Sequence, residues 1–110
     1  MDGQFGDVFL IFFFFPIDQR IENVSYELYE ELNTSLNPKN RWKKLAGKLK
    51  FKERDVANFE LHNGNATVEM LSSWGHGRDA TLSALFDVFV NLGWDREKNI
   101  VARYMVPASV

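Results

Sequence analysis

Residues 41–51 read RWKKLAGKLKF and predict an amphipathic helix. The apolar residues recur at steps of three and four, which places them on one side of a helix: Trp42, Leu45, Ala46 and Leu49. The lysines lie elsewhere around it: Lys43, Lys44, Lys48 and Lys50. Burying a tryptophan stabilises a fold by roughly 3 kcal/mol. The apolar side of this helix therefore predicts the packing centre of a small all-helical domain, and its cationic side needs a separate explanation.

The totals of the chain fit one globular domain with a single core. It has 110 residues, of which 45% are hydrophobic, and its net charge is -2. Such a small net charge gives no general attraction to nucleic acid or to acidic lipid. Because there is no cysteine, disulfides, thiolate nucleophiles and sulfur-bound metals are excluded, and the composition fits a reducing compartment. We therefore expect a cytoplasmic location.

The first sixteen residues form a Phe-rich arm that holds six of the ten phenylalanines. Residues 8–15 are uninterrupted apolar residues, but this run is shorter than the roughly 20 residues of a membrane-spanning helix. Asp2 and Asp7 stand where a secretory signal would carry basic residues. Three interpretations stay open: a strand-like arm packed on the domain, a sequence foreign to the natural chain, or an adhesive partner site.

The pattern after Pro16 predicts that the domain folds without this arm. We expect a chain that lacks residues 1–15 to keep its cooperative thermal unfolding and to become more soluble, because the helix signals from Ile17 onward are sufficient by themselves. Circular dichroism on the truncated chain tests this. Loss of cooperative unfolding would show that the arm belongs to the core.

Six helices are predicted between residues 17 and 106, and residues 107–110 form a tail that begins with Pro107. Their expected ranges are 17–36, 41–51, 53–61, 66–74, a fifth from Asp79 or Thr81 to 92, and 96–106. Asn40, Asn65 and Asp95 are the expected caps of the second, fourth and sixth helices. The third helix should turn Val56, Ala57 and Phe59 inward. We expect one core from these residues: Trp42, Leu45, Leu71, Trp74, Leu85, Phe86 and Phe89.

Catalytic and metal-binding patterns are missing from the sequence. His62 and His76 lie in turn-like segments without metal-ligand spacing, and there is neither a phosphate-binding glycine loop nor a G-x-S-x-G motif. The serines on predicted helices have no base in register, and the carboxylates are spread over outer faces. We therefore expect no enzyme activity, no metal and no cofactor.

Basic residues concentrate around the second predicted helix. Eight of the thirteen lie within sixteen positions: Lys39, Arg41, Lys43, Lys44, Lys48, Lys50, Lys52 and Arg54. The first predicted helix is acidic on its outer face, with Glu22, Glu27, Glu30 and Glu31. A domain with one basic and one acidic surface can bind a copy or a relative of itself head to tail, in an open assembly. A solvated face and a nucleic-acid surface are the alternatives; the latter has less support because no exposed aromatic residues interleave with the cations.

Several short motifs, taken in order, resemble a death domain. They are Leu36-Asn37-Pro38, Trp42 with Leu45-Ala46 and Leu49-x-Phe51, Thr67-x-x-Met70-Leu71-x-x-Trp74, Ala80-Thr81-Leu82-x-x-Leu85 and Leu92-Gly93. The resemblance covers residues 17–106 and is greatest to the adaptors and receptor-associated kinases of the Toll and interleukin-1 pathways. The netrin-receptor, ankyrin and tumour-necrosis-factor-receptor types are the alternatives. The Phe-rich arm and Lys52, where many members have a capping serine, depart from the family pattern.

The resemblance implies an antiparallel six-helix bundle in a Greek-key arrangement, without catalytic activity. Such domains act by homotypic contact in oligomeric signalling complexes of innate immunity or apoptosis. Three partner-binding surfaces are implied. The first sets the basic residues Arg41, Lys43, Lys44, Lys48 and Arg54 against acidic residues of a neighbour, either on its first helix (Glu27, Glu30 and Glu31) or on its fourth. The second uses the end of the fourth helix and the loop after it, from Trp74 to Asp79, with His76, Arg78 and Asp79. The third uses Asp55, Asn58 and Glu60 against inter-helix loops.

Overall fold

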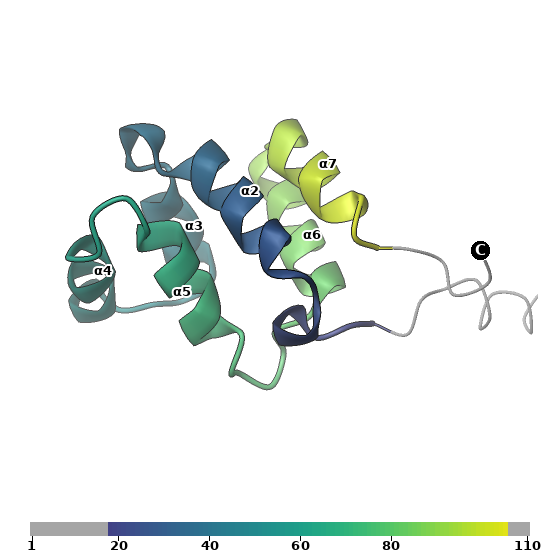
Figure 1. Ribbon diagram of the computed structural model, residues 1–110, viewed down its shortest axis with the longest axis horizontal. Coiled ribbons are helices and arrows are strands. Elements are labelled where there is room, and N and C mark those ends of the chain that lie inside the picture. The colour runs from purple at the N-terminus through teal and green to yellow at the C-terminus, as the bar shows by residue number, and fades with distance from the viewer. Residues whose placement is uncertain (1–17, 106–110) are drawn as a thin grey trace, which may run out of the picture.

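Six α-helices and two 3-10 turns make up most of residues 18–105, the part of the chain that the computed structural model describes (Figure 1). In chain order they are η1 (Ile21–Asn23), α2 (Tyr26–Leu36), η2 (Pro38–Asn40), α3 (Trp42–Lys48), α4 (Glu53–Glu60), α5 (Ala66–Trp74), α6 (Leu82–Leu92) and α7 (Asp95–Ala102). Within this range the only β pairing is an isolated antiparallel bridge between Arg20 and Thr81. The predicted all-α fold with six helices is confirmed. Residues 1–17, with the Phe-rich arm, and residues 106–110, with the tail, lie outside the described residues.

Helix α2 lies at the centre of the bundle. It packs against α5 on one side and against α7 on the other, and α6 and α7 form a hairpin (Figure 1). Both α3 and α4 pack against α5, with α4 at one end of the domain. The two helices that carry the cationic cluster are therefore fixed to the core through α5.

The core confirms most of the predicted set. Trp42, Leu45, Leu71, Leu85 and Phe89 are buried in one cluster, and Trp74 and Phe86 pack on it while remaining partly exposed. Ile21, Leu28, Leu32 and Leu36 complete the cluster from the first part of the chain. The expectation for Ala57 was wrong, because its side chain is exposed on α4 while Val56 and Phe59 turn inward.

The first helix begins later than residue 17. Residues 21–23 form a 3-10 turn, Val24 is extended, and α2 starts only at Tyr26. Ser25 sets this start, because its side-chain oxygen accepts a hydrogen bond of 3.1 Å from the Glu27 N–H. The apolar periodicity that runs from Ile21 to Leu36 therefore spans a break in the helix, since Ile21 reaches the core from the separate turn.

Three other helix starts show which residue types cap them. Of the two predicted starts of the fifth helix, Asp79 and Thr81, the structure has Thr81 as the cap of α6, because its side-chain oxygen accepts from the Ala84 N–H at 3.2 Å. Asn40 does not cap α3: Asn40 and Lys39 both have positive φ, and Arg41 precedes the helix without a side-chain cap. Asp95 is the first residue of α7 and Trp94 occupies the cap position. At α7, Asp95 and Glu97 instead place negative charge in the first turn, where the helix dipole favours it.

The end of α3 uses a left-handed residue that is not glycine. Lys50 has φ 71°, its N–H bonds to the Gly47 carbonyl, and the Phe51 N–H bonds to the Ala46 carbonyl, both at 3.0 Å. The same pair of backbone bonds closes α6, where the left-handed residue is Gly93. Glycine is the usual residue at this position because a Cβ crowds the backbone there.

Lys50→Gly should therefore stabilise the domain. We expect a gain of about 0.5–1 kcal/mol in the free energy of unfolding, since relief of the left-handed strain exceeds the added entropy of the unfolded chain. Chemical denaturation measures it, and Gly93→Ala is the reverse control, expected to lose about 1 kcal/mol. A less stable Lys50→Gly variant would contradict the role assigned to the left-handed turn.

Candidate interaction surfaces

The outer faces of α3 and α4 carry cations that make no ion pair with any described residue. Lys44 and Lys48 are exposed on α3, and Arg54 is exposed in the first turn of α4. None of the ion pairs found among residues 18–105 includes them. Of the residues predicted for the basic surface, these three are the ones whose charge is not engaged in an ion pair with a described residue. We refer to them below as the basic surface.

Lys43 joins α3 to α4 instead. Its Nζ lies 2.5 Å from Oε2 of Glu60, and 5.9 Å from the centre of the Trp42 ring. Both residues of the pair are substantially exposed, so the contact contributes no more than about 1 kcal/mol to folding. It does bring Lys43, expected on the first surface, together with Glu60, expected on the third.

Arg41 is occupied by a network inside the bundle. Its guanidinium donates to Oε2 of Glu97 at 2.8 Å and to the Ser35 carbonyl at 3.2 Å, and lies 4.5 Å from the centre of the Trp94 ring. The Ser35 hydroxyl also donates to Glu97, which is 1% exposed. Burial raises the pKa of Glu97, but the hydrogen bonds from Ser35 and Arg41 outweigh it and hold that pKa below its usual value. Arg41 thus ties α2, α3 and α7 together, and we leave it out of the basic surface.

The acidic residues of α2 divide in the same way. Glu27 and Glu30 are exposed, and we refer to them as the acidic surface. The Glu31 carboxylate accepts hydrogen bonds from Arg103 and from the Tyr104 hydroxyl, at the end of α7. The bonds from Tyr104 and Arg103 lower the pKa of Glu31, and the bond to Glu31 raises the pKa of Tyr104 to about 12. Glu31 therefore serves first to attach α7 to α2.

The loop between α5 and α6 is held in place by Arg20. The Arg20 guanidinium donates to the carbonyls of Gly75 at 2.7 Å, Gly77 at 2.8 Å and Arg78 at 3.2 Å. Backbone bonds from Ile21 to Ala80 and from Leu82 to Gln19 fasten the same segment. The predicted residues of this loop are all exposed: His76, Arg78 and Asp79. These hydrogen bonds hold the loop in one conformation, so that its three exposed side chains lie on a defined surface.

The third predicted group lies on α4. Asn58 and Glu60 are exposed and Asp55 is half-buried. Only Glu60 of the three makes a side-chain ion pair among the described residues, with Lys43. The structure therefore places the three side chains on one helix but gives them no shared contact.

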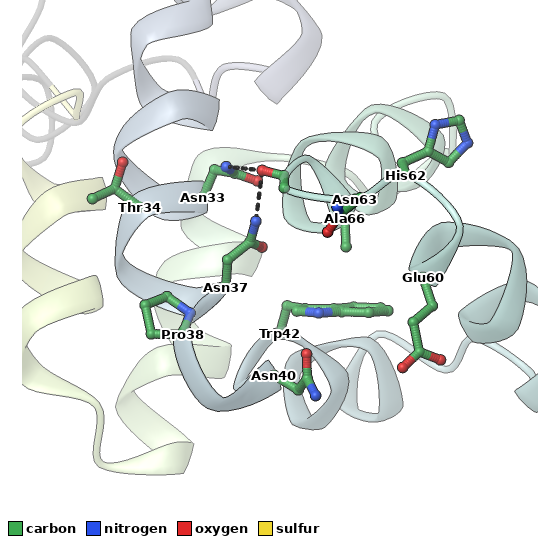
Figure 2. A pocket seen from close by; sticks show the side chains of 11 residues that line it. Asn33, Thr34, Asn37, Pro38, Asn40, Trp42, Glu60, His62, Asn63 and Ala66 are labelled. Carbon is green, nitrogen blue, oxygen red and sulfur yellow. Dashed lines mark hydrogen bonds between the residues drawn. The ribbon is translucent and has the colours of Figure 1, made fainter.

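A polar cleft opens beside α4, with a volume of about 620 Å³ (Figure 2). Its walls come from the end of α2, the turn before α3 and the loop between α4 and α5. The lining residues are Asn33, Thr34, Asn37, Pro38, Asn40, Trp42, Glu60, His62, Asn63, Gly64 and Ala66. The sequence did not predict this cleft, because residues 33–42 and 60–66 form it together and a local pattern does not show that these two segments meet.

Two asparagines of α2 organise one wall of the cleft. The side-chain amides of Asn33 and Asn37 donate to the Gly64 carbonyl at 2.8 and 2.7 Å (Figure 2). Their carbonyl oxygens accept from the N–H groups of Val68 and Thr67, at 3.2 and 3.3 Å. The start of α5 is therefore capped from α2 and not by Asn65, which makes no capping bond. The spacing of four between Asn33, inside α2 where asparagine is unfavourable, and Asn37, which follows the last residue of α2, was the available signal.

Comparison with known families identifies the chain. A sequence model described as Death domain matches residues 29–105, which is more than half of its length. The chain belongs to the death domain family. No match was found among curated proteins, and none among solved structures.

As a death domain, the chain is a homotypic protein-interaction module, and domains of this family are not catalytic. The six-helix bundle described above agrees with that membership. Over residues 18–105, no helix is long and apolar enough to cross a membrane. The same residues contain no group of three or more histidine, aspartate or glutamate side chains placed to hold a metal ion.

Proposed function

We propose that this death domain assembles head to tail, with the basic surface of one copy or relative against the acidic surface of the next. The observation that carries the proposal is the separation of the charged residues into two groups. Lys44, Lys48 and Arg54 have no ionic partner in the described domain, whereas Arg41, Lys43 and Glu31 are engaged within it. Unpaired charges of opposite sign on a binding module favour steering between partners.

The positions of the two surfaces favour an open assembly. Lys44 and Lys48 lie on α3 and Arg54 on α4, near one end of the bundle, whereas Glu27 and Glu30 lie in the first turns of α2 (Figure 1). Because the surfaces are on different helices, one domain can use both at once. Such a heterologous contact adds subunits without needing to close into a dimer.

The biological setting that we propose is a cytoplasmic signalling complex of innate immunity or apoptosis. The turn with Pro38 ahead of the Trp42 helix and the leucine-containing helix that ends in Trp74 support the subgroup of Toll and interleukin-1 adaptors and their associated kinases. Other death-domain proteins are the proposed partners. The proposed second contact is made by the loop with His76, Arg78 and Asp79. The proposed third contact is made by Asp55 and Asn58 on α4.

Reversing the charge of the basic surface tests the proposal. The double variant Lys44→Glu/Lys48→Glu should remain folded, because exposed charges contribute only about 0–1 kcal/mol each. It should weaken assembly with a death-domain partner by about tenfold or more, since each interface loses two attractions and gains repulsion. Light scattering and binding measurements at low and high salt test this. The difference in binding between the wild type and the variant should be largest at low salt, where charges are least screened.

Arg96→Glu/Lys98→Glu is the matched control, because it changes the net charge equally on α7. It should assemble like the wild type. Glu27→Lys/Glu30→Lys on the partner copy should restore part of the binding lost by the α3 variant. If the α3 variant assembled as well as the wild type, the basic surface would have no part in assembly. If the wild type bound generic duplex DNA and no death domain, the nucleic-acid alternative would be favoured.

A further inference from the structure

Asn63 and Gly64 form an exposed Asn-Gly pair at the rim of the polar cleft (Figure 2). Gly64 has φ +84°, and no atom lies within 4 Å of the position that a Cβ would take. Within residues 18–105, neither the Gly64 N–H nor the Asn63 side chain makes a hydrogen bond. The Asn63 carboxamide and the backbone nitrogen that follows it are thus both accessible and unshielded.

We propose that Asn63 is a site of spontaneous deamidation through a cyclic imide with Gly64. The Gly64 nitrogen attacks Cγ of Asn63, and the Cγ–Nδ2 bond breaks. The nitrogen that leaves takes the proton of the Gly64 N–H and departs as ammonia. Water then opens the imide: attack at Cγ yields aspartate, and attack at the main-chain carbonyl yields isoaspartate, in which the chain runs through the former side chain. Ammonia and water are the only other species exchanged.

The same loop contains a built-in comparison. Asn65 is also exposed, but its following residue is Ala66, whose nitrogen begins helix α5 and whose side chain is buried. Attack on Asn65 would have to distort the first turn of the helix past a Cβ. Attack on Asn63 meets neither obstacle, because glycine has no Cβ and takes many backbone conformations.

Deamidation at Asn63 alters the cap of α5. Isoaspartate inserts one carbon into the main chain directly before Gly64, whose carbonyl accepts from both Asn33 and Asn37. Displacing that carbonyl removes the acceptor that orients the two amides, and with it the bonds to the Thr67 and Val68 N–H groups. The new carboxylate also lies on the cleft that Glu60 lines, so that this rim becomes more acidic.

The test is incubation of the purified, folded chain at mildly alkaline pH, followed by peptide mapping with mass spectrometry. Conversion at Asn63 should be about tenfold faster than at Asn65, which corresponds to a barrier difference near 1.4 kcal/mol. Labelling by an isoaspartyl methyltransferase identifies the isoaspartate. Gly64→Ala should slow conversion and Asn63→Gln should abolish it at this position. Equal rates at Asn63 and Asn65, or no conversion in the folded chain while the denatured chain reacts, would overturn the assignment.

A second measurement separates the added charge from the added carbon. The isoaspartate form should melt at a lower temperature than the fresh protein and lower than the Asn63→Asp variant, which carries the same charge on a normal main chain. If the isoaspartate form had the same melting temperature as the Asn63→Asp variant, the proposed effect of the added carbon on the α5 cap would be wrong. This result is independent of the proposed assembly, because it is read on the isolated domain.

Discussion

Trp42→Ala should lower the free energy of unfolding by about 3–5 kcal/mol. The Trp42 side chain is 2% exposed and contacts Phe59 edge to face, with ring centres 6.4 Å apart. Truncation removes this contact and leaves a cavity between α3 and α4 that the surrounding helices cannot fill. Since a small domain is stable by only about 5–15 kcal/mol, this loss is between a fifth and the whole of its free energy of unfolding. Thermal and urea denaturation measure the loss.

Trp42→Phe is the matched variant, because it keeps an aromatic ring in the same space and should cost less than the alanine change. An unchanged melting temperature for Trp42→Ala would mean that the packing described for α3 is wrong. Ala57→Ser, on the exposed side of α4, provides a neutral control in the same part of the bundle.

Glu97→Gln should cost about 3 kcal/mol, because it leaves Arg41 without its counter-charge inside the network. The side chain of Arg41 is 34% exposed and can recover some hydration, which places the expected cost at the low end for a buried pair. Replacing both residues, as Arg41→Met/Glu97→Leu, should recover much of the loss, since apolar groups of similar size need no partner. A double variant no better than Glu97→Gln would show that packing, and not the unpaired charge, causes the loss.

The same network makes stability depend on pH. The pKa of Glu97 is lower in the folded chain than the value of about 4.3 expected when unfolded, so folding favours the ionised form. Its stabilising contribution is complete above the unfolded value and disappears as the pH falls through the lower folded value. In acid, the stability difference between wild type and Glu97→Gln should therefore shrink, which urea denaturation over a pH series can follow.

The sequence predicted the fold class and most of the core because those depend on periodicity. Trp42, Leu45 and Ala46 recur at helical steps on α3, and such a pattern is still recognisable when the ends of the helix are predicted wrongly. The helix starts were predicted less well. Asn40 has the composition of a cap, but the short connection after Pro38 requires left-handed residues there, and a local pattern does not reveal that requirement.

Two features of the site depend on partners that are distant in sequence. Glu97 lies in the first turn of α7, and only the packing of α2 and α3 on α7 brings Ser35 and Arg41 to it, which a local pattern does not reveal. Lys43 and Lys44 lie on α3 and Glu30 and Glu31 on α2, yet from the sequence Lys43 and Glu31 could not be distinguished from Lys44 and Glu30. Their partners, Glu60 and Arg103, are 17 and 72 positions away.

Arg20 has a mechanical consequence for any longer chain that continues from the start of the domain. The segment around it is bound to the α5–α6 loop by backbone hydrogen bonds at Ile21 and Leu82 and by three guanidinium bonds. Tension applied ahead of Asp18 would therefore load these bonds before it reached α2. Hydrogen exchange can observe this unit: the amides of Ile21 and Leu82 should lose protection together, and Arg20→Ala should accelerate exchange at both while leaving the amides of α2 protected.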